Sequence, residues 1–274
     1  MLPFLTDHLP GWSRKTIKQR LAQGCVTVNG ASVKQFDYAL HPGDAVEVST
    51  TTNPTPPVRV TLEILYQDRW LVAINKPAGL LSVNNATGTA ANALTILRRQ
   101  LARPSRPVKL WPAHRIDCGT SGVLLFATSR STREALAATW SECEKTYLAV
   151  VEGCPDPNHG TIDQPLRPDR EKYLMHVGQH PHAKTAITHY QTERAGAARS
   201  LLRIRLATGR QHQIRAHLAW LGYPVVGDPR YGTAGPRLGL HAVSLRLTHP
   251  ETQQAMRLEA PPPLDFMALL APGA

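Results

Sequence analysis

The fold is decided by one stretch in the middle of the chain, residues 114–127, which reads HRIDCGTSGVLLFA. Its first half is rich in the Gly, Thr and Ser of a turn and carries one carboxylate, Asp117. Its second half, residues 123–127, is an unbroken apolar run with the length of a buried strand. A polar group on a loop held by a rigid element is typical of a catalytic position. An Asp that only caps the backbone amides of its own turn is the alternative.

The composition of the whole chain limits the class of protein. The 274 residues include 31 Lys and Arg against 20 Asp and Glu, a formal net charge of +11, and 42% of them are hydrophobic. Such a charge indicates a polyanionic partner or an anionic membrane surface, and a merely basic protein is the alternative. No apolar run reaches the length of about 18 residues that a transmembrane helix needs. The N-terminus shows no secretory signal, so we expect a cytoplasmic protein without a membrane segment.

Cofactor and metal motifs are missing from the sequence. The four cysteines show no Cys-x-x-Cys spacing, which favours free thiols. No glycine-rich phosphate loop follows a strand, so we expect no nucleotide cofactor. His176, His180 and His182 lie close together, but no carboxylate or cysteine completes a metal site of recognisable spacing. We therefore expect no metal.

The first 50 residues have the pattern of a small separate module. Ser13 is a good N-cap for a helix that ends near Gly24. A short strand follows, and Asn29-Gly30 is typical of a tight hairpin turn. Residues 51–60 are polar and contain prolines, as in a semi-rigid linker. These patterns predict a small module at 1–50, a linker at 51–60 and a large domain at 61–274.

The N-terminal module resembles the RNA-binding domain named after small-subunit ribosomal protein four. The resemblance rests on Ser13-Arg14-Lys15, on the run from Gly24 to Gly30, and on Pro42-Gly43-Asp44-Ala45-Val46. It implies that three basic side chains on the outer side of the helix contact RNA: Arg14, Lys15 and Lys18. A basic helix face that is simply solvated is the alternative.

The large domain mixes strand and helix patterns. Strands are expected at 62–66, 70–74, 123–127, 145–151, 185–190, 201–206 and 240–247. Helices are expected at 90–101, after a capping box at 131–134 with Leu136, Ala137 and Trp140 facing inward, at 214–221, and after 261–263. The segment 154–182 has the composition of a loop. Tyr147 lies on one face of the strand 145–151, where an ordinary half-buried sheet tyrosine is the alternative to a functional one.

From about residue 62 to the C-terminus the chain resembles the RluA-like family of RNA pseudouridine synthases. The motifs are Asn75-Lys76-Pro77-x-Gly79, His114-Arg115-Ile116-Asp117 with Thr120-Ser121-Gly122, Lys145-x-Tyr147, Gly209-Arg210-x-His212-Gln213-Ile214-Arg215-x-His217-Leu218, Gly227-Asp228-x-x-Tyr231-Gly232 and Leu240-His241-Ala242. The resemblance implies a catalytic domain with a mainly antiparallel mixed sheet flanked by helices. Together with the small N-terminal module this makes an α+β protein. The family's reaction converts uridine to pseudouridine in RNA without metal or organic cofactor.

The resemblance also implies roles for single residues. Asp117 would be the catalytic aspartate, as nucleophile or as base, and Arg215 its basic partner. Tyr147 would pack on the target base and serve in removing its ring proton. Arg115 would approach the RNA near the flipped nucleotide. Arg210 and His212 belong to the same motif as Arg215, and we expect them to bind RNA as well.

These expectations describe a monomeric enzyme that acts on structured ribosomal or transfer RNA. Two alternatives remain at the level of sequence. One is an inactive RNA-binding or ribosome-assembly protein, although Asp117, Tyr147 and Arg215 are all present. The other is a hydrolase of glycosidic bonds, which needs a second carboxylate such as Glu142 or Asp228.

Overall fold

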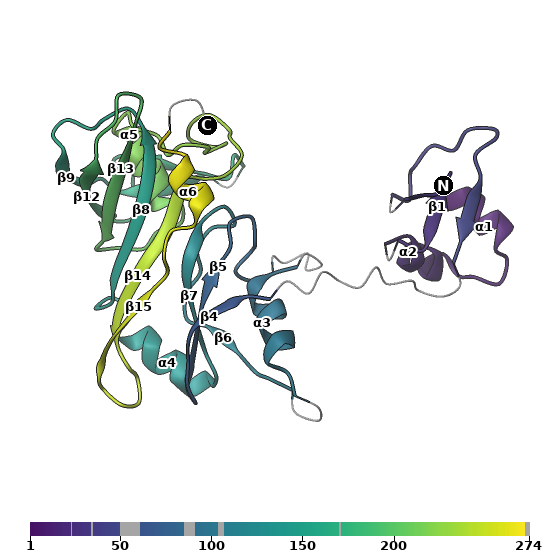
Figure 1. The fold of residues 1–274 in the computed structure, drawn as a ribbon, viewed down its shortest axis with the longest axis horizontal. Helices are drawn as coiled ribbons and strands as arrows, with labels where there is room; N and C mark the ends of the chain where they lie inside the picture. The colour runs from purple at the N-terminus through teal and green to yellow at the C-terminus, as the bar shows by residue number, and fades with distance from the viewer. Residues whose placement is uncertain are drawn as a thin grey trace. The chain divides into compact units, whose positions relative to one another are not determined.

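The chain forms two compact units, Met1–Val60 and Thr61–Ala274 (Figure 1). A computed structural model describes residues 1–22, 24–33, 35–49, 61–84, 91–103, 107–169 and 171–271. The predicted linker at 51–60 therefore lies outside the described residues. Within the described ranges, no helix has the length and apolar character required to cross a membrane.

The first unit packs two helices against a small sheet. The elements are α1 (Leu2–His8), α2 (Arg14–Ala22), β1 (Val26–Val28), β2 (Ala31–Ser32) and β3 (Val46–Val48), with the strand order β2-β1-β3. The helix α2 begins where the sequence predicts, because the Ser13 hydroxyl accepts a hydrogen bond from the amide of Thr16 at 3.1 Å. Asn29 and Gly30 both have positive φ, at 51° and 80°, as the tight hairpin turn requires. The helix α1 was not predicted; it buries Leu2 and Leu5 against α2 and β1.

The described part of the second unit is built on one ten-stranded sheet. Its path is β4-β5-β7-β14-β8-β13-β12-β9, with β15 paired to β14 and β6 to β7. The bounds are β4 (Glu63–Gln67), β5 (Leu71–Lys76), β6 (Trp111–Pro112), β7 (Ser121–Ala127), β8 (Glu144–Glu152), β9 (His159–Asp163), β12 (Ile187–Arg194), β13 (Arg199–Leu206), β14 (Leu240–Thr248) and β15 (Ala255–Glu259). The pair β7–β14 is parallel and the other pairs in this sheet are antiparallel. The mainly antiparallel α+β fold is confirmed.

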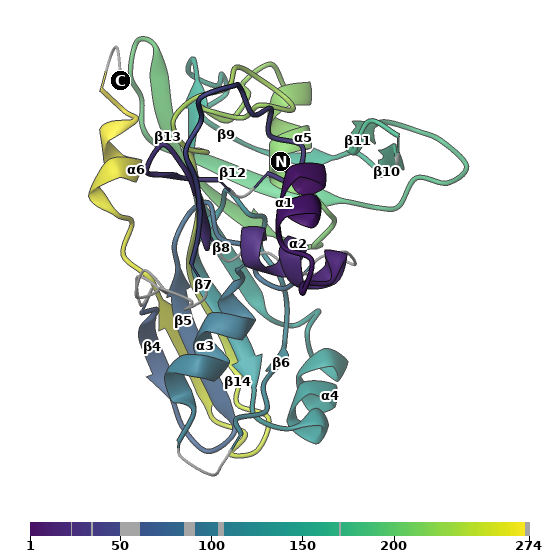
Figure 2. The same ribbon diagram turned by 90° about the vertical axis from the view of Figure 1, so that its right-hand side faces the viewer.

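Helices cover both faces of this sheet (Figure 2). They are α3 (Ala93–Leu101), α4 (Arg130–Ala138), α5 (Gln213–Trp220) and α6 (Leu264–Ala268). Leu124 and Phe126 of β7 pack with α3, whereas Leu125 packs with Leu136 of α4 on the other face. Every residue of β7 is buried, which explains its unbroken apolar run.

The structure corrects three predictions of local structure. The N-cap of α4 is Ser129, two residues before the predicted Ser131, because the Ser129 hydroxyl accepts a hydrogen bond from the amide of Thr132. Ala137, predicted to face inward, is exposed. The segment 154–182 contains three strands instead of a loop: β9, β10 (Leu166–Asp169) and β11 (Leu174–Val177), of which β10 and β11 pair with each other. The strand β15 was also not predicted.

Candidate active site

The turn that carries Asp117 is held at both ends before β7 begins. The Ser82 hydroxyl donates to the carbonyl of Ile116 at 2.7 Å and accepts from the amide of Ile116 at 3.2 Å. The amide of Gly79 donates to the carbonyl of Cys118 at 2.9 Å. The turn is therefore tied to the segment after β5 as well as to β7, and Asp117 stands on a rigid base.

Lys76, the last residue of β5, binds backbone carbonyls of both of these turns. Its side chain is completely buried, and its ammonium donates to three backbone carbonyls: Pro77 at 2.9 Å, Leu80 at 2.6 Å and Cys118 at 3.1 Å. Burial lowers the pKa of Lys76 to about 8. The sequence motif gave Lys76 no role, whereas in the structure its ammonium links the carbonyls of two turns.

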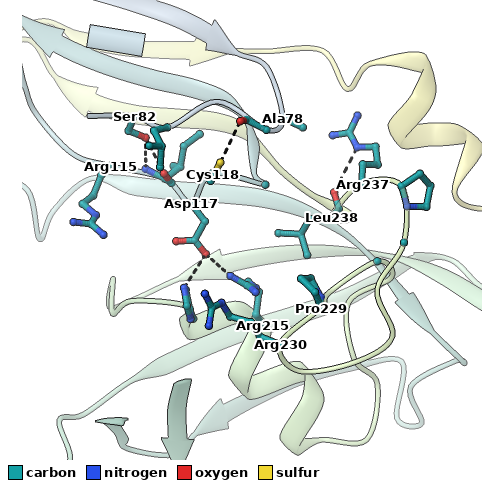
Figure 3. Close-up of a pocket in the computed structure, with 18 of the residues that line it drawn as sticks. Ala78, Ser82, Arg115, Asp117, Cys118, Arg215, Pro229, Arg230, Arg237 and Leu238 are labelled. Atoms are coloured by element: carbon teal, nitrogen blue, oxygen red, sulfur yellow. Dashed lines mark hydrogen bonds and ion pairs between the residues drawn. The ribbon is translucent and has the colours of Figure 1, made fainter. Parts of the chain in front are cut away.

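Arg215 binds two carboxylates that are far apart in sequence, Asp117 and Asp228, and Figure 3 shows its contact with Asp117. Its Nε and Nη2 donate to Oδ2 and Oδ1 of Asp228, each at 2.7 Å. Its Nη1 donates to Oδ2 of Asp117 at 3.0 Å. The Asp228 side chain is fully buried, whereas 25% of the Asp117 side chain is exposed. The bidentate pair with Asp228 thus fixes the guanidinium plane, and the remaining nitrogen faces the exposed carboxylate.

The electrostatics of this cluster favour its charged state. Burial opposes ionisation of Asp228, but the hydrogen bonds and the charge of Arg215 outweigh it, so the pKa of Asp228 lies below its ordinary value. Burial also opposes the charge on Arg215, but its bonds to Asp228 and Asp117 outweigh it and raise its pKa. The ion pair is therefore present at neutral pH.

The helix α5 holds Arg215 against β12 through buried polar side chains. The Gln213 amide donates to the carbonyl of Ile187 and to the hydroxyl of Thr188, both at 3.0 Å. The buried His217 ring lies 2.9 Å from the same Thr188 hydroxyl. Because these hydrogen bonds lie within one helical turn of Arg215, they fix the position of Arg215 relative to β12.

His212 and Tyr231 complete the surroundings of the ion pair. Nε2 of His212 lies 3.9 Å from Oδ2 of Asp117, and its Nδ1 lies 3.1 Å from the Tyr231 hydroxyl. The Arg215 guanidinium lies over the Tyr231 ring, 5.3 Å from its centroid. Burial lowers the pKa of His212, so the ring is mostly neutral at pH 7. His212 therefore lies beside the same carboxylate oxygen that Arg215 binds.

All the candidate residues in the second unit line one cavity of about 310 Å³. They are Arg115, Asp117, Tyr147, Arg210, His212 and Arg215. Tyr147 is half-buried on β8, and burial together with the negative Asp117 raises its pKa above the ordinary value. Arg115 and Arg210 are exposed at this cavity. The predicted catalytic and RNA-binding residues of the large domain are thus brought together.

The candidate residues of the first unit are exposed on α2: Arg14, Lys15 and Lys18. Of the three histidines at 176, 180 and 182, His176 lies on β11, and its Nε2 is 3.1 Å from Oδ2 of Asp169 on β10. Within the described ranges, no group of three or more His, Cys, Asp or Glu side chains is arranged to hold a metal ion.

Sequence reasoning missed two residues of this cluster, Asp228 and Tyr231. Both stand in the motif Gly227-Asp228-x-x-Tyr231-Gly232, and the notion of Asp228 as a second reacting carboxylate does not fit its complete burial under Arg215. A sequence signal existed, because an acid in a Gly- and Pro-containing turn needs a partner if it is buried. The identity of that partner depends on tertiary contacts.

Comparison with known proteins shows the family of the chain. The model of the RNA pseudouridylate synthase family matches residues 70–220. The chain is 34% identical over 286 residues to the RNA pseudouridine synthase YlyB of Bacillus subtilis, covering 97% of this chain and 91% of that protein. It is also 34% identical over 290 residues to the ribosomal large subunit pseudouridine synthase D of Nitrosomonas europaea, covering 97% and 82%.

A solved structure shares the fold of the second unit. The human RNA pseudouridylate synthase domain containing 4 superposes with a TM-score of 0.63 at 26% sequence identity, covering 76% of this chain and 91% of that one. Sequence, fold and the clustered Asp, Tyr and Arg agree. The chain belongs to the RluA-type RNA pseudouridine synthases, enzymes that isomerise uridine in RNA.

Proposed function

We propose that this enzyme forms pseudouridine in large-subunit ribosomal RNA, with Asp117 as its reacting carboxylate and without a cofactor. The observation that carries the proposal is the arrangement of Asp117: Arg215 holds its Oδ2 at 3.0 Å, and Tyr147 lines the same cavity. The choice of RNA is supported by relatives that are named for the ribosomal large subunit. Such a substrate places the activity in the cytoplasm.

The reaction is an isomerisation in which every atom is kept. The bond from ribose C1′ to uracil N1 breaks, the base turns, and C1′ bonds to C5. The proton on C5 leaves and N1 gains a proton. No electrons are transferred to or from another molecule, so the chain's own acid and base groups are sufficient.

The contacts of Asp117 select its reacting oxygen. Oδ2 accepts from Arg215 and faces His212, whereas Oδ1 has no hydrogen bond to a described residue. We therefore assign Oδ1 as the atom that approaches the ribose, whether it attacks C1′ or removes a proton from C2′. Arg215 stabilises the carboxylate without occupying this oxygen.

Tyr147 is suited to hold the uracil. Its ring offers a flat face to a base, and its raised pKa keeps the hydroxyl protonated at neutral pH. A uridine must leave its stack to reach this cavity, at a cost of about a few kcal/mol. Arg115 and Arg210 at the cavity, and Arg14, Lys15 and Lys18 on α2, offset that cost if they bind phosphates.

A pseudouridine map of total RNA tests the proposal. RNA is compared from cells with the gene, without it, and without it but carrying a plasmid copy of the wild type or of Asp117→Asn. We expect specific pseudouridines in large-subunit ribosomal RNA to disappear without the gene and to return only with the wild type. A map that does not change when the gene is lost would support the inactive RNA-binding alternative.

A further inference from the structure

The wall of the larger cavity contains an arginine that the reaction does not use. This cavity, of about 680 Å³, shares Arg115, Asp117 and Arg215 with the smaller one and so continues the path past the reacting carboxylate (Figure 3). Among the described residues that line it are two further arginines, Arg230 and Arg237. A nucleotide next to a uridine bound at Asp117 can therefore lie in this larger cavity.

Arg237 is held rigidly at this wall. Only 8% of its side chain is exposed. Its Nη2 donates to the Ser121 hydroxyl at 2.9 Å, and that hydroxyl lies 2.8 Å from Nδ1 of His241. Nε2 of His241 lies 2.9 Å from the carbonyl of Ala260. Since burial keeps His241 neutral, Nε2 donates to Ala260 and Nδ1 accepts from Ser121, which leaves the Ser121 oxygen free to accept from Arg237.

The carboxylate that pairs with Arg237 is much less firmly held. Nη1 of Arg237 donates to Oδ1 of Asp265, in the first turn of α6, and 67% of the Asp265 side chain is exposed. An ion pair with such an exposed partner contributes little to stability, because water solvates the carboxylate equally well. A buried, oriented guanidinium with a weakly held anion is suited to exchange that anion for another.

We infer that Arg237 is a binding site for an RNA phosphate next to the target uridine, and that Asp265 occupies this site until RNA arrives. A phosphodiester brings the same charge as Asp265 and two oxygens for the planar guanidinium. The remaining arginines of the cavity, Arg115 and Arg230, add positive charge around the same strand. The identification of the ligand as RNA depends on the proposed function; the exchange of anions depends only on Arg237 and Asp265.

A double-mutant cycle tests the inference in the full chain. Arg237→Gln, Asp265→Asn and the double variant are made in the Asp117→Asn background, so that turnover does not change the RNA. Binding of an unmodified large-subunit ribosomal RNA transcript is measured over a range of salt concentrations. Glu134→Gln is the matched control, because Glu134, like Asp265, is an exposed acid paired with an arginine, here Arg130 on α4. The helices α4 and α6 lie at opposite ends of the second unit in both views (Figures 1 and 2).

We expect Asp265→Asn to tighten binding about threefold to tenfold, because the RNA no longer has to displace a carboxylate. Arg237→Gln should weaken binding and reduce the slope of log K against log salt by about 0.7, the loss of one phosphate contact. In the Arg237→Gln background, Asp265→Asn should have no effect. If Arg237→Gln does not fold, Arg237→Lys must still show the tightening by Asp265→Asn.

Other outcomes overturn the inference. If Asp265→Asn lowers the melting temperature but leaves affinity unchanged, the pair only anchors α6. If its effect persists without Arg237, or if Glu134→Gln has the same effect, general charge explains it. Pseudouridine formation by the wild type on the same transcript is measured in parallel. If the wild type forms no pseudouridine but the variants show the expected affinities, the proposed function is wrong and the phosphate site stands. If the wild type forms pseudouridine but the variants do not show those affinities, the phosphate site is wrong and the proposed function stands.

Discussion

At the scale of single residues, Arg215 has two tasks with different consequences for the protein. Its bidentate pair with the fully buried Asp228 neutralises a carboxylate that water cannot reach. Its third contact orients the partly exposed Asp117. The sequence predicted only the second task, under which loss of Arg215 costs catalysis without necessarily unfolding the protein. The burial of Asp228 changes that expectation.

We expect Arg215→Gln to lower the free energy of unfolding at pH 7 by about 3–5 kcal/mol, because it leaves an unpaired buried carboxylate. In the wild type the lowered pKa of Asp228 stabilises the fold above about pH 4, and this stabilisation is lost as the pH falls through the folded-state pKa. In the variant, burial raises that pKa, so lowering the pH from 7 to 5 should reduce the defect. Urea unfolding at both pH values measures this. Asp228→Asn added to Arg215→Gln should recover stability at pH 7; no recovery would contradict the explanation.

Tyr147→Phe separates the two tasks of the tyrosine. The ring is kept, so we expect RNA affinity within about twofold of the wild type, since stacking needs only the aromatic face. The rate of pseudouridine formation at saturating RNA should fall about a hundredfold if the hydroxyl transfers or positions a proton. Because the pKa of Tyr147 lies above its ordinary value, the wild-type rate should show no increase from its ionisation between pH 7 and 9. Unchanged turnover in Tyr147→Phe would leave only the stacking role.

At the scale of elements, the sequence predicted best those strands whose surroundings are uniform. The strand β7 is buried on both faces, so its apolar run could be recognised directly. The short edge strand β9 and the separate two-stranded sheet β10–β11 were missed because few of their side chains are buried: β9 buries only Ile162, and β10–β11 buries Leu166 and Met175. Their outward residues are polar and have the composition of a loop.

The candidate site shows the same limit. The residues Asp117, Tyr147 and Arg215 were placed together by family resemblance, because no periodicity relates positions on a turn, a strand and a helix that are far apart in the chain. The polar residues that support them, two buried and one half-buried, were missed, since their partners are set by tertiary contacts: Lys76, Asp228 and Tyr231.

Lys76→Met tests whether the hydrogen bonds of Lys76 to the two turns support Asp117. The substitution keeps the apolar stem but removes the ammonium that the carbonyls of Pro77 and Leu80 bind, and leaves the carbonyl of Cys118 with the amide of Gly79 alone. We expect the free energy of unfolding to fall by about 1.5–3 kcal/mol, the usual contribution of hydrogen bonds made by a charged group. The rate at saturating RNA should fall even where the protein is folded, because the Asp117 turn loses its support. Wild-type turnover in a folded Lys76→Met protein would show that the position of Asp117 does not depend on the hydrogen bonds of Lys76.

At the scale of the whole molecule, two units with separate cores share the net positive charge. The reacting residues all lie in the second unit, whereas Arg14, Lys15 and Lys18 are exposed in the first. If the first unit binds RNA, its contribution belongs to affinity and leaves the chemical step unchanged.

We expect Arg14→Gln, Lys15→Gln and Lys18→Gln together to weaken RNA binding and to reduce the salt slope by about 0.7–0.9 for each lost phosphate contact. The rate at saturating RNA should stay at the wild-type value. The control replaces three exposed arginines that line neither cavity, Arg130, Arg133 and Arg257. An equal loss of affinity in the control would mean that net charge, and not the α2 surface, is responsible.

The central claim, that Asp117 isomerises a uridine in RNA, is tested most directly by release of tritium from RNA made with [5-³H]uridine. Forming the bond from C1′ to C5 expels the hydrogen on C5, so each pseudouridine releases one tritium. We predict release by the wild type without free uracil, and none by Asp117→Asn, which should still fold and bind the RNA. Tritium release by Asp117→Asn at the wild-type rate, or free uracil from the wild type, would contradict the assignment.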